Sequence, residues 1–391
     1  MDYTNRLQKQ IYDWTDDYCD ITESDILEFL NDEASFRNFG ESLSDFISSV
    51  IDTSKSTPEE ILKKRAEQEG LYLNRNTVNN WFSGKRPKKG DQSREHMYKI
   101  AFALDLNVDD TVRLFQKVYL DKPFNMRSIR EFIYYYCLKN HLTYKHAEHL
   151  IALAENNVDD TAESTVMTRI MTAAADDALN DAAVLAYIHD HPHNFQLSNR
   201  SSRSIMEELL RQILPSEEDA ALLKSGNALE GNVHSYIAKE LAHFGNEILQ
   251  EYRNKSFTSI STMIDIIMGI DMVRTRAESS ESLIKNATLL SAIKNRFPSK
   301  HSFSLEEPSF EEIRKVIILL FSYKCWYEKQ YNDVSQSLVE YTEEMNALLF
   351  DASLQTLYPG NPYDWMFMFC TMSKFPLDIF RDIMAGALLA E

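Results

Sequence analysis

Amide and basic side chains gather in one short stretch of the chain, NRNTVNNWFSGKRPKKG at residues 74–90. An asparagine amide can pair with the edge of adenine through two hydrogen bonds, and an arginine can pair in the same way with guanine. Lysine and arginine beside such residues bind phosphates and fix the register on the backbone. The stretch from Leu71 to Gly90 carries five basic residues and no acid, although the whole chain has a formal net charge of −19. These residue types together indicate recognition of a DNA duplex.

The spacing of the uncharged residues bears on whether this stretch is a recognition surface or only a solvated basic loop. Val78, Trp81 and Phe82 stand at i, i+3 and i+4, so a short helix would bury them on one face. The dipeptide Ser83-Gly84 ends this helix, and an exposed basic loop follows. The opposite face of the helix would carry Arg75, Asn76, Asn79 and Asn80.

Flanking helices must hold this segment in place. Thr57 and Pro58, followed by two glutamates, are a helix-start signal, and this first helix should end near Gly70. Two amphipathic helices are predicted after the basic loop, over residues 95–104 and 108–119. The sequence therefore predicts two helices joined by a turn, with the second short and rich in amides, and two further helices packed against them.

The pattern T-V-x-x-W-x-x-G-K-R resembles the recognition-helix end of the Cro/C1-type (XRE-like) helix-turn-helix family. It is carried here by Thr77, Val78, Trp81, Gly84, Lys85 and Arg86, with Pro87 directly after it. The following REHMYKIAFALDLNVDDTVRLF is similar to the family's fourth and fifth helices, so the resemblance covers residues 39–119. It implies contacts to bases and nearby phosphates by Arg75, Asn76, Thr77, Asn79 and Asn80. It implies phosphate contacts by Lys85 and Arg86, and we assign Lys88 and Lys89 of the same loop to the DNA-binding set.

The chain departs from the family pattern in two places. The segment between Ala66 and Trp81 is about two residues longer, with Tyr72 and Leu73 as the extra residues of the turn. An acidic segment of about 38 residues also precedes the domain, whereas family members mostly begin near their N-terminus. Residues 1–54 hold 13 acids against three bases, a local charge of −10. A helical domain that kept the fold and lost DNA binding is the alternative, and the acid-free stretch argues against it.

Composition predicts an all-α protein of more than one domain. The 391 residues exceed one ordinary core, and only ten glycines and ten prolines leave few turns for a sheet. We expect an acidic helical extension at 1–38, a five-helix helix-turn-helix domain at 39–120 and a large helical region at 121–391. A break between two parts of the last region is expected near 195–230. The four cysteines have no paired spacing, and no apolar run reaches about 18 residues, so we expect a cytoplasmic protein without membrane contact.

Other clusters of reactive residue types do not form a catalytic or metal-binding pattern. His189, His191 and His193 surround Pro192 and would not share a helix face, so capping of carbonyls is favoured over a metal site. The three tyrosines at 134–136 would span about 200° of a helix and could not form one flat platform for bases. No phosphate-binding glycine loop or G-x-S-x-G pattern is present. We therefore expect no enzyme activity, no cofactor and no metal.

The helical region after residue 120 leaves two main functional hypotheses open; a third, less favoured one is an enzyme within this acid-rich region, where nothing singles out catalytic carboxylates. In the first, the protein is a transcriptional regulator that binds double-stranded DNA as a homodimer, and this region senses a peptide, small molecule or protein effector. In the second, it is an interaction or effector protein of a mobile element or phage-defence system, and its helix-turn-helix serves autoregulation or partner binding. The aromatic loops at 283–304 and 357–380 would be either a binding surface or ordinary packed connections.

Overall fold

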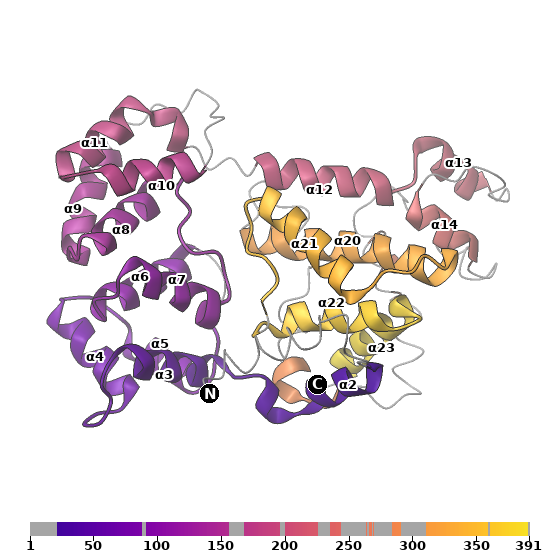
Figure 1. Ribbon diagram of the computed structural model, residues 1–391, viewed down its shortest axis with the longest axis horizontal. Helices are drawn as coiled ribbons and strands as arrows, with labels where there is room; N and C mark the ends of the chain where they lie inside the picture. Colours follow the sequence, from indigo (N-terminus) through magenta and orange to yellow (C-terminus); the bar gives the residue numbers. More distant parts are fainter. Residues whose placement is uncertain are drawn as a thin grey trace. The chain divides into compact units, whose positions relative to one another are not determined.

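Every regular element in the described part of the chain is a helix (Figure 1). The computed structural model describes residues 22–87, 91–155, 168–195, 200–225, 235–243, 284–290, 310–358 and 360–389, with residues 263, 266, 267 and 269. The all-α prediction is thus confirmed. Among the described helices, none combines the length and the apolar character that crossing a bilayer requires.

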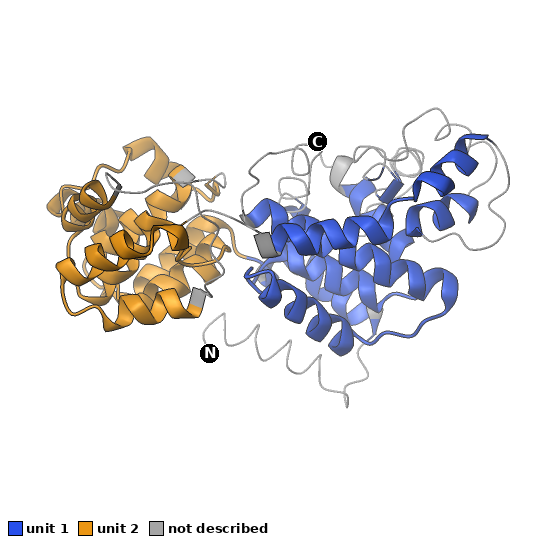
Figure 2. Ribbon diagram, turned by 90° about the horizontal axis from the view of Figure 1, so that it is seen from above, with its two compact units in different colours: residues 1–36, 200–391 blue, residues 37–199 orange. Residues whose placement is uncertain are grey.

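The chain divides into two compact units (Figure 2). Unit 2 comprises residues 37–199, and unit 1 comprises residues 1–36 together with 200–391. The predicted boundary at residue 120 therefore falls inside unit 2, and the predicted break near 195–230 includes the actual boundary at 199/200. The predicted N-terminal extension also differs from the structure, because its described part, residues 22–36, belongs to the core of unit 1.

Unit 2 begins with the five helices that the sequence predicts around the basic stretch. They are α3 (Phe39–Val50), α4 (Pro58–Gln68), α5 (Arg75–Phe82), α6 (Asp91–Ala103) and α7 (Val108–Arg113), which continues as the π-helical segment η2 (Leu114–Tyr119). Thr57 caps α4 in a capping box with Glu60, Pro58 occupies its first turn, and Gly70 follows it with a φ of 66°. The start and end signals read from the sequence thus act where they were predicted.

The second half of unit 2 contains α8 (Ile129–Lys139), α9 (Tyr144–Glu155), α10 (Thr168–Asp177), α11 (Asp181–Asp190) and the short η3 (Pro192–Phe195). Its apolar side chains join those of α3 to α7 in one continuous core. The consecutive tyrosines of α8 separate as predicted: Tyr134 is buried and donates to Glu148, while Tyr135 and Tyr136 donate to acids of α10 and α11. They pack the helices of this half together and form no single platform.

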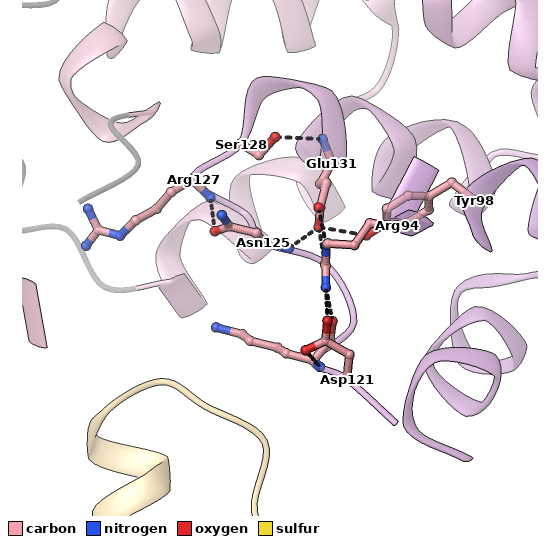
Figure 3. Close-up of polar contacts among 8 residues, drawn as sticks. Arg94, Tyr98, Asp121, Asn125, Arg127, Ser128 and Glu131 are labelled. Atoms are coloured by element: carbon pink, nitrogen blue, oxygen red, sulfur yellow. Dashed lines mark hydrogen bonds and ion pairs between the residues drawn. The ribbon is translucent and has the colours of Figure 1, made fainter. Parts of the chain in front are cut away.

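A buried ion cluster joins α6 to α8 across the predicted boundary at residue 120 (Figure 3). The Arg94 guanidinium donates to both carboxylate oxygens of Glu131, at 2.8 and 2.7 Å, and to Asp121 at 3.0 Å. Glu131 also accepts from the Tyr98 hydroxyl at 2.8 Å and from the Asn125 backbone N–H. Because Arg94 and Asp121 are each only 9% exposed, the cluster holds α3–α7 and α8 as one folded unit.

Glu131 should make the stability of unit 2 sensitive to acid. Burial raises its pKa, but the charge of Arg94 and the hydrogen bonds from Arg94, Asn125 and Tyr98 outweigh burial and leave the pKa below the ordinary value of 4.5. A carboxyl with a lowered folded pKa stabilises the fold above its unfolded pKa and loses that contribution as the pH falls through the folded pKa. We therefore expect wild-type unfolding to become easier below about pH 4.5, with a smaller pH dependence in Glu131→Gln. Chemical denaturation between pH 3 and pH 7 measures this, and equal slopes for both proteins would contradict it.

Unit 1 is built around α22 (Pro362–Met372), an apolar helix that is buried on all sides. The other described helices of unit 1 are α2 (Glu23–Asn31), η1 (Glu33–Ser35), α12 (Arg200–Ile213), α13 (Glu217–Ser225), α14 (Tyr236–His243), α20 (Phe310–Asn332), α21 (Leu338–Asp351) and α23 (Pro376–Leu389). Residues 362–371 of α22 are all buried. The N-terminal α2 packs against this helix, with the rings of Phe29 and Trp365 4.8 Å apart.

Two buried arginines tie the helices of unit 1 together. Arg314 of α20 donates to both oxygens of Asp364 at 2.9 and 2.8 Å, and Arg381 of α23 donates to Glu240 of α14 at 2.6 Å. Each carboxylate is fully buried. Within each pair the arginine and the carboxylate compensate each other's charge inside the core, so we assign both pairs a structural role.

Candidate nucleic-acid interface

Helix α5 presents one exposed polar face and one buried apolar face. Val78 and Trp81 are 1% and 3% exposed, as predicted, whereas Phe82 is only half-buried. Thr77 is also half-buried and lies at the edge of the exposed face. The exposed face consists of Arg75, Asn76, Asn79 and Asn80, the four positions predicted from the sequence.

The buried face of α5 is held rigidly by α3 and α6. The Trp81 ring lies edge-on to Phe39 at 6.3 Å and to His96 at 5.6 Å between ring centroids. Burial lowers the pKa of His96, and the charge of Lys99 lowers it further, which favours the neutral imidazole at neutral pH. Gly40 of α3 lies so close to the end of α5 that a Cβ there would be 2.6 Å from the Phe82 carbonyl oxygen. Close backbone packing and aromatic contacts thus fix the orientation of the exposed face.

The three amides of the exposed face have different surroundings. Asn76 donates its backbone N–H to the Asn74 side chain at 2.9 Å, which caps α5 and leaves the Asn76 amide facing solvent. The Asn79 oxygen accepts from Lys63 of α4 at 2.8 Å. The Asn80 side chain has no hydrogen-bond partner among the described residues. Asn76 and Asn80 can therefore offer both donor and acceptor to a ligand, as pairing with adenine requires.

Arg75 occupies a position that is unfavourable for the helix itself. It is the first residue of α5, where the positive end of the helix dipole favours acids, yet the first turn of α5 contains none. By contrast, the first turn of α4 carries Glu59 and Glu60. An exposed guanidinium at a helix N-terminus adds its charge to the free N–H groups, and together they attract an anion such as a phosphate. The charge at this helix end thus favours an anion and does not favour the helix itself.

The loop after α5 contributes one exposed cation and one that is docked on the protein. Lys85 is exposed, and its backbone N–H donates to the Asn80 carbonyl at 2.9 Å. Arg86 is half-buried, donates to the Tyr119 carbonyl at 2.9 Å and lies over the Phe39 ring at 5.6 Å. The predicted phosphate contact is therefore easier to assign to Lys85 than to Arg86. Lys88 and Lys89 lie outside the described residues.

Comparisons with known proteins place no constraint on this site. No protein-family model, curated protein or solved structure matches the chain. The resemblance to the XRE-like family consequently rests on the residues quoted from the sequence.

The other sequence candidates are used in packing. His191 follows the end of α11 and contacts the Tyr187 carbonyl at 3.1 Å, as the capping interpretation predicted, while His189 contacts Asp190. Within the described residues, no three metal-binding side chains come together. Within residues 357–380, Asp364 in the first turn of the buried α22 accepts from the Tyr358 backbone N–H and from Arg314. These contacts favour the interpretation of this segment as an ordinary packed connection. The loop at 291–304 lies outside the described residues.

Lys63 is the residue of this surface that the sequence analysis missed. Its partner Asn79 stands 16 residues away across the turn, on another helix. The i,i+4 spacing of Glu59 and Lys63 signals an ion pair within α4 and gives no hint of a third partner.

Removing the Lys85 side chain and removing the Arg86 side chain should change the stability of the protein by different amounts. We expect Lys85→Ala to leave stability within about 0.5 kcal/mol of wild type, because the side chain is exposed. Arg86→Ala removes a charged donor from a backbone carbonyl and should destabilise the protein by about 1.5–3 kcal/mol. Thermal denaturation of both variants measures this difference, and equal melting temperatures would contradict the docked position of Arg86.

Proposed function

We propose that this protein is a sequence-specific, DNA-binding transcriptional regulator. The observation that supports the proposal most strongly is the exposed face of α5, where arginine and three amides stand side by side without an acid, on a helix fixed by Trp81. Amides and guanidinium groups on one helix face are suited to the edges of bases in the major groove. Lys85 at the end of the same helix is suited to a phosphate.

The acidic remainder of the chain has a role in this proposal. A net charge of −19 opposes non-specific attraction to DNA, so binding would depend on contacts gathered at one face. Such binding should weaken steeply with salt, in proportion to the phosphates that are neutralised. We propose that the helices of unit 1 serve dimerisation or the sensing of an effector. A dimer would suit an operator with two half-sites about one helical turn apart.

Selection of bound fragments from random double-stranded DNA at about 100 mM salt tests the proposal, with three proteins compared. Wild type is expected to enrich an inverted repeat. A double variant, Arg75→Ala with Lys85→Ala, is expected to lose enrichment and to flatten the salt dependence by about one unit for each phosphate contact removed. The matched control, Arg211→Ala with Lys224→Ala, removes the same charge from exposed positions of unit 1 and should bind like wild type.

Asn80→Ala separates base contacts from phosphate contacts in the same experiment. It is expected to change the selected sequence without changing the salt dependence, because an amide carries no charge. Absence of enrichment by folded wild-type protein would contradict the regulator proposal. The interaction or effector hypothesis would then take its place, and proteins bound by unit 1 would be the next object of study.

A further inference from the structure

We propose that Lys63 determines which base Asn79 recognises, by fixing the Asn79 amide as a hydrogen-bond donor toward a guanine edge. The inference rests on the proposed DNA-binding function. It concerns a residue that would touch no base itself and would act through its neighbour on the recognition helix.

Lys63 is held in place by contacts on two helices. Its Nζ lies 2.5 Å from Glu59 Oε1, four residues earlier on α4, and 2.8 Å from Asn79 Oδ1 on α5. About a third of each charged side chain is exposed, and the adjacent Leu62 is fully buried in the interface between the helices. The ammonium is therefore positioned between α4 and α5 and is not extended toward solvent.

The chemistry of the ammonium fixes the orientation of the amide. A lysine ammonium has three donors and no acceptor, so the Asn79 atom that faces it must be the carbonyl oxygen. The NH₂ group of Asn79 then points away from Lys63 and offers two donors to a ligand. This assignment follows from the partner's chemistry and does not depend on distinguishing oxygen from nitrogen in the amide.

A fixed donor favours one base over the others. Guanine presents two acceptors, N7 and O6, in the major groove, whereas adenine presents one acceptor and one amino donor. Pairing with adenine through two hydrogen bonds needs the amide oxygen as an acceptor, and at Asn79 the positively charged ammonium already uses one of the two lone pairs of that oxygen. The adenine amino group would approach the ammonium and be repelled. Asn79 should thus prefer guanine, whereas Asn80, which has no such partner among the described residues, keeps the capacity to pair with adenine.

Selection from random double-stranded DNA with the full-length protein tests this inference through four proteins. Wild type is expected to select guanine at one position of each half-site. Lys63→Met keeps an apolar stem and removes the ammonium, so the preference for guanine over adenine there should fall by about tenfold while other positions stay unchanged. Lys63→Arg restores a donor and should restore guanine. Lys64→Met removes the same charge from the exposed neighbour and should keep the wild-type preference.

An unchanged base preference in Lys63→Met, or the same change in Lys64→Met, would overturn the inference while leaving the regulator function intact. If wild type selects no sequence, the proposed function fails, and the assignment of a base to Asn79 fails with it. The contact itself is measured without DNA, by the side-chain NH₂ resonances of Asn79 in the free protein. Lys63→Met should shift them and Lys64→Met should not; unshifted resonances in Lys63→Met would overturn the inference independently of any DNA result.

Discussion

Arg94→Ala is expected to destabilise unit 2 by about 3–5 kcal/mol, because it leaves two carboxylates inside the protein without their partner. For a unit of this size, the loss corresponds to a melting temperature lower by roughly 6–20 °C. Arg94 precedes residue 120 in the chain, whereas Asp121 and Glu131 follow it. The helices on both sides of residue 120 should therefore lose structure together. Thermal unfolding followed by circular dichroism and by hydrogen exchange in α6 and α8 measures both effects.

A double-mutant comparison shows whether the cluster acts as one interaction. Arg94→Ala combined with Glu131→Gln should cost less than the sum of the single changes, because both remove the same ion pair. Arg211→Ala is the control, since its pair with Glu208 is 70% exposed at the arginine and should contribute less than about 1 kcal/mol. Additive effects, or unfolding of α6 without α8, would show that the two halves of unit 2 are independent.

Arg75→Glu is expected to stabilise the protein and to abolish specific DNA binding. An acid in the first turn of α5 interacts favourably with the helix dipole where arginine does not, which should raise stability by about 0.3–1 kcal/mol. The same acid would face phosphates, and placing like charges together costs several kcal/mol, so affinity should fall on the order of 100-fold or more. Melting curves and binding titrations of one protein preparation measure both quantities.

Charge reversal at Lys224 is the matched control for Arg75→Glu. Lys224 is exposed in the last turn of α13, where a base is favourable for the helix. Lys224→Glu changes the net charge equally, but it should lower stability slightly and leave DNA binding close to that of wild type. A similar loss of affinity in both variants would mean that overall charge, and not the position of Arg75, governs binding.

Local signals in the sequence predicted the bounds of α4 and α5 well. Thr57 and Pro58 begin α4 and Gly70 follows its end, as predicted, because capping depends on residues within one turn. Helical periodicity predicted the exposed face of α5 and the burial of Val78 and Trp81, whereas Phe82 is only half-buried. Helix α6 begins four residues earlier than predicted, since its first turn lacks an apolar residue that could mark it.

Interactions between distant residues could not be predicted in this way. Arg94 and Glu131 are 37 residues apart, and Arg86 and Tyr119 are 33 apart, with no spacing that relates them. A boundary at residue 120 was expected because the resemblance to the helix-turn-helix family ends at residue 119, but the buried cluster continues across it. The basic loop also gave no sign that Arg86 would turn back onto the protein, since exposure of a side chain depends on what lies beside it in the fold.

The discontinuous composition of unit 1 has a consequence for the order of events during synthesis. Helix α2 is synthesised before the other described helices of unit 1, yet its packing partner Trp365 is made 336 residues after Phe29. At translation rates of about 5–20 residues per second, the interval is roughly 20 to 70 s. Unit 2 is uninterrupted in the chain, so it can fold within that interval. During that interval the apolar side chains of α2 lack their native partners on α22, so a chaperone that shields nascent chains could bind them.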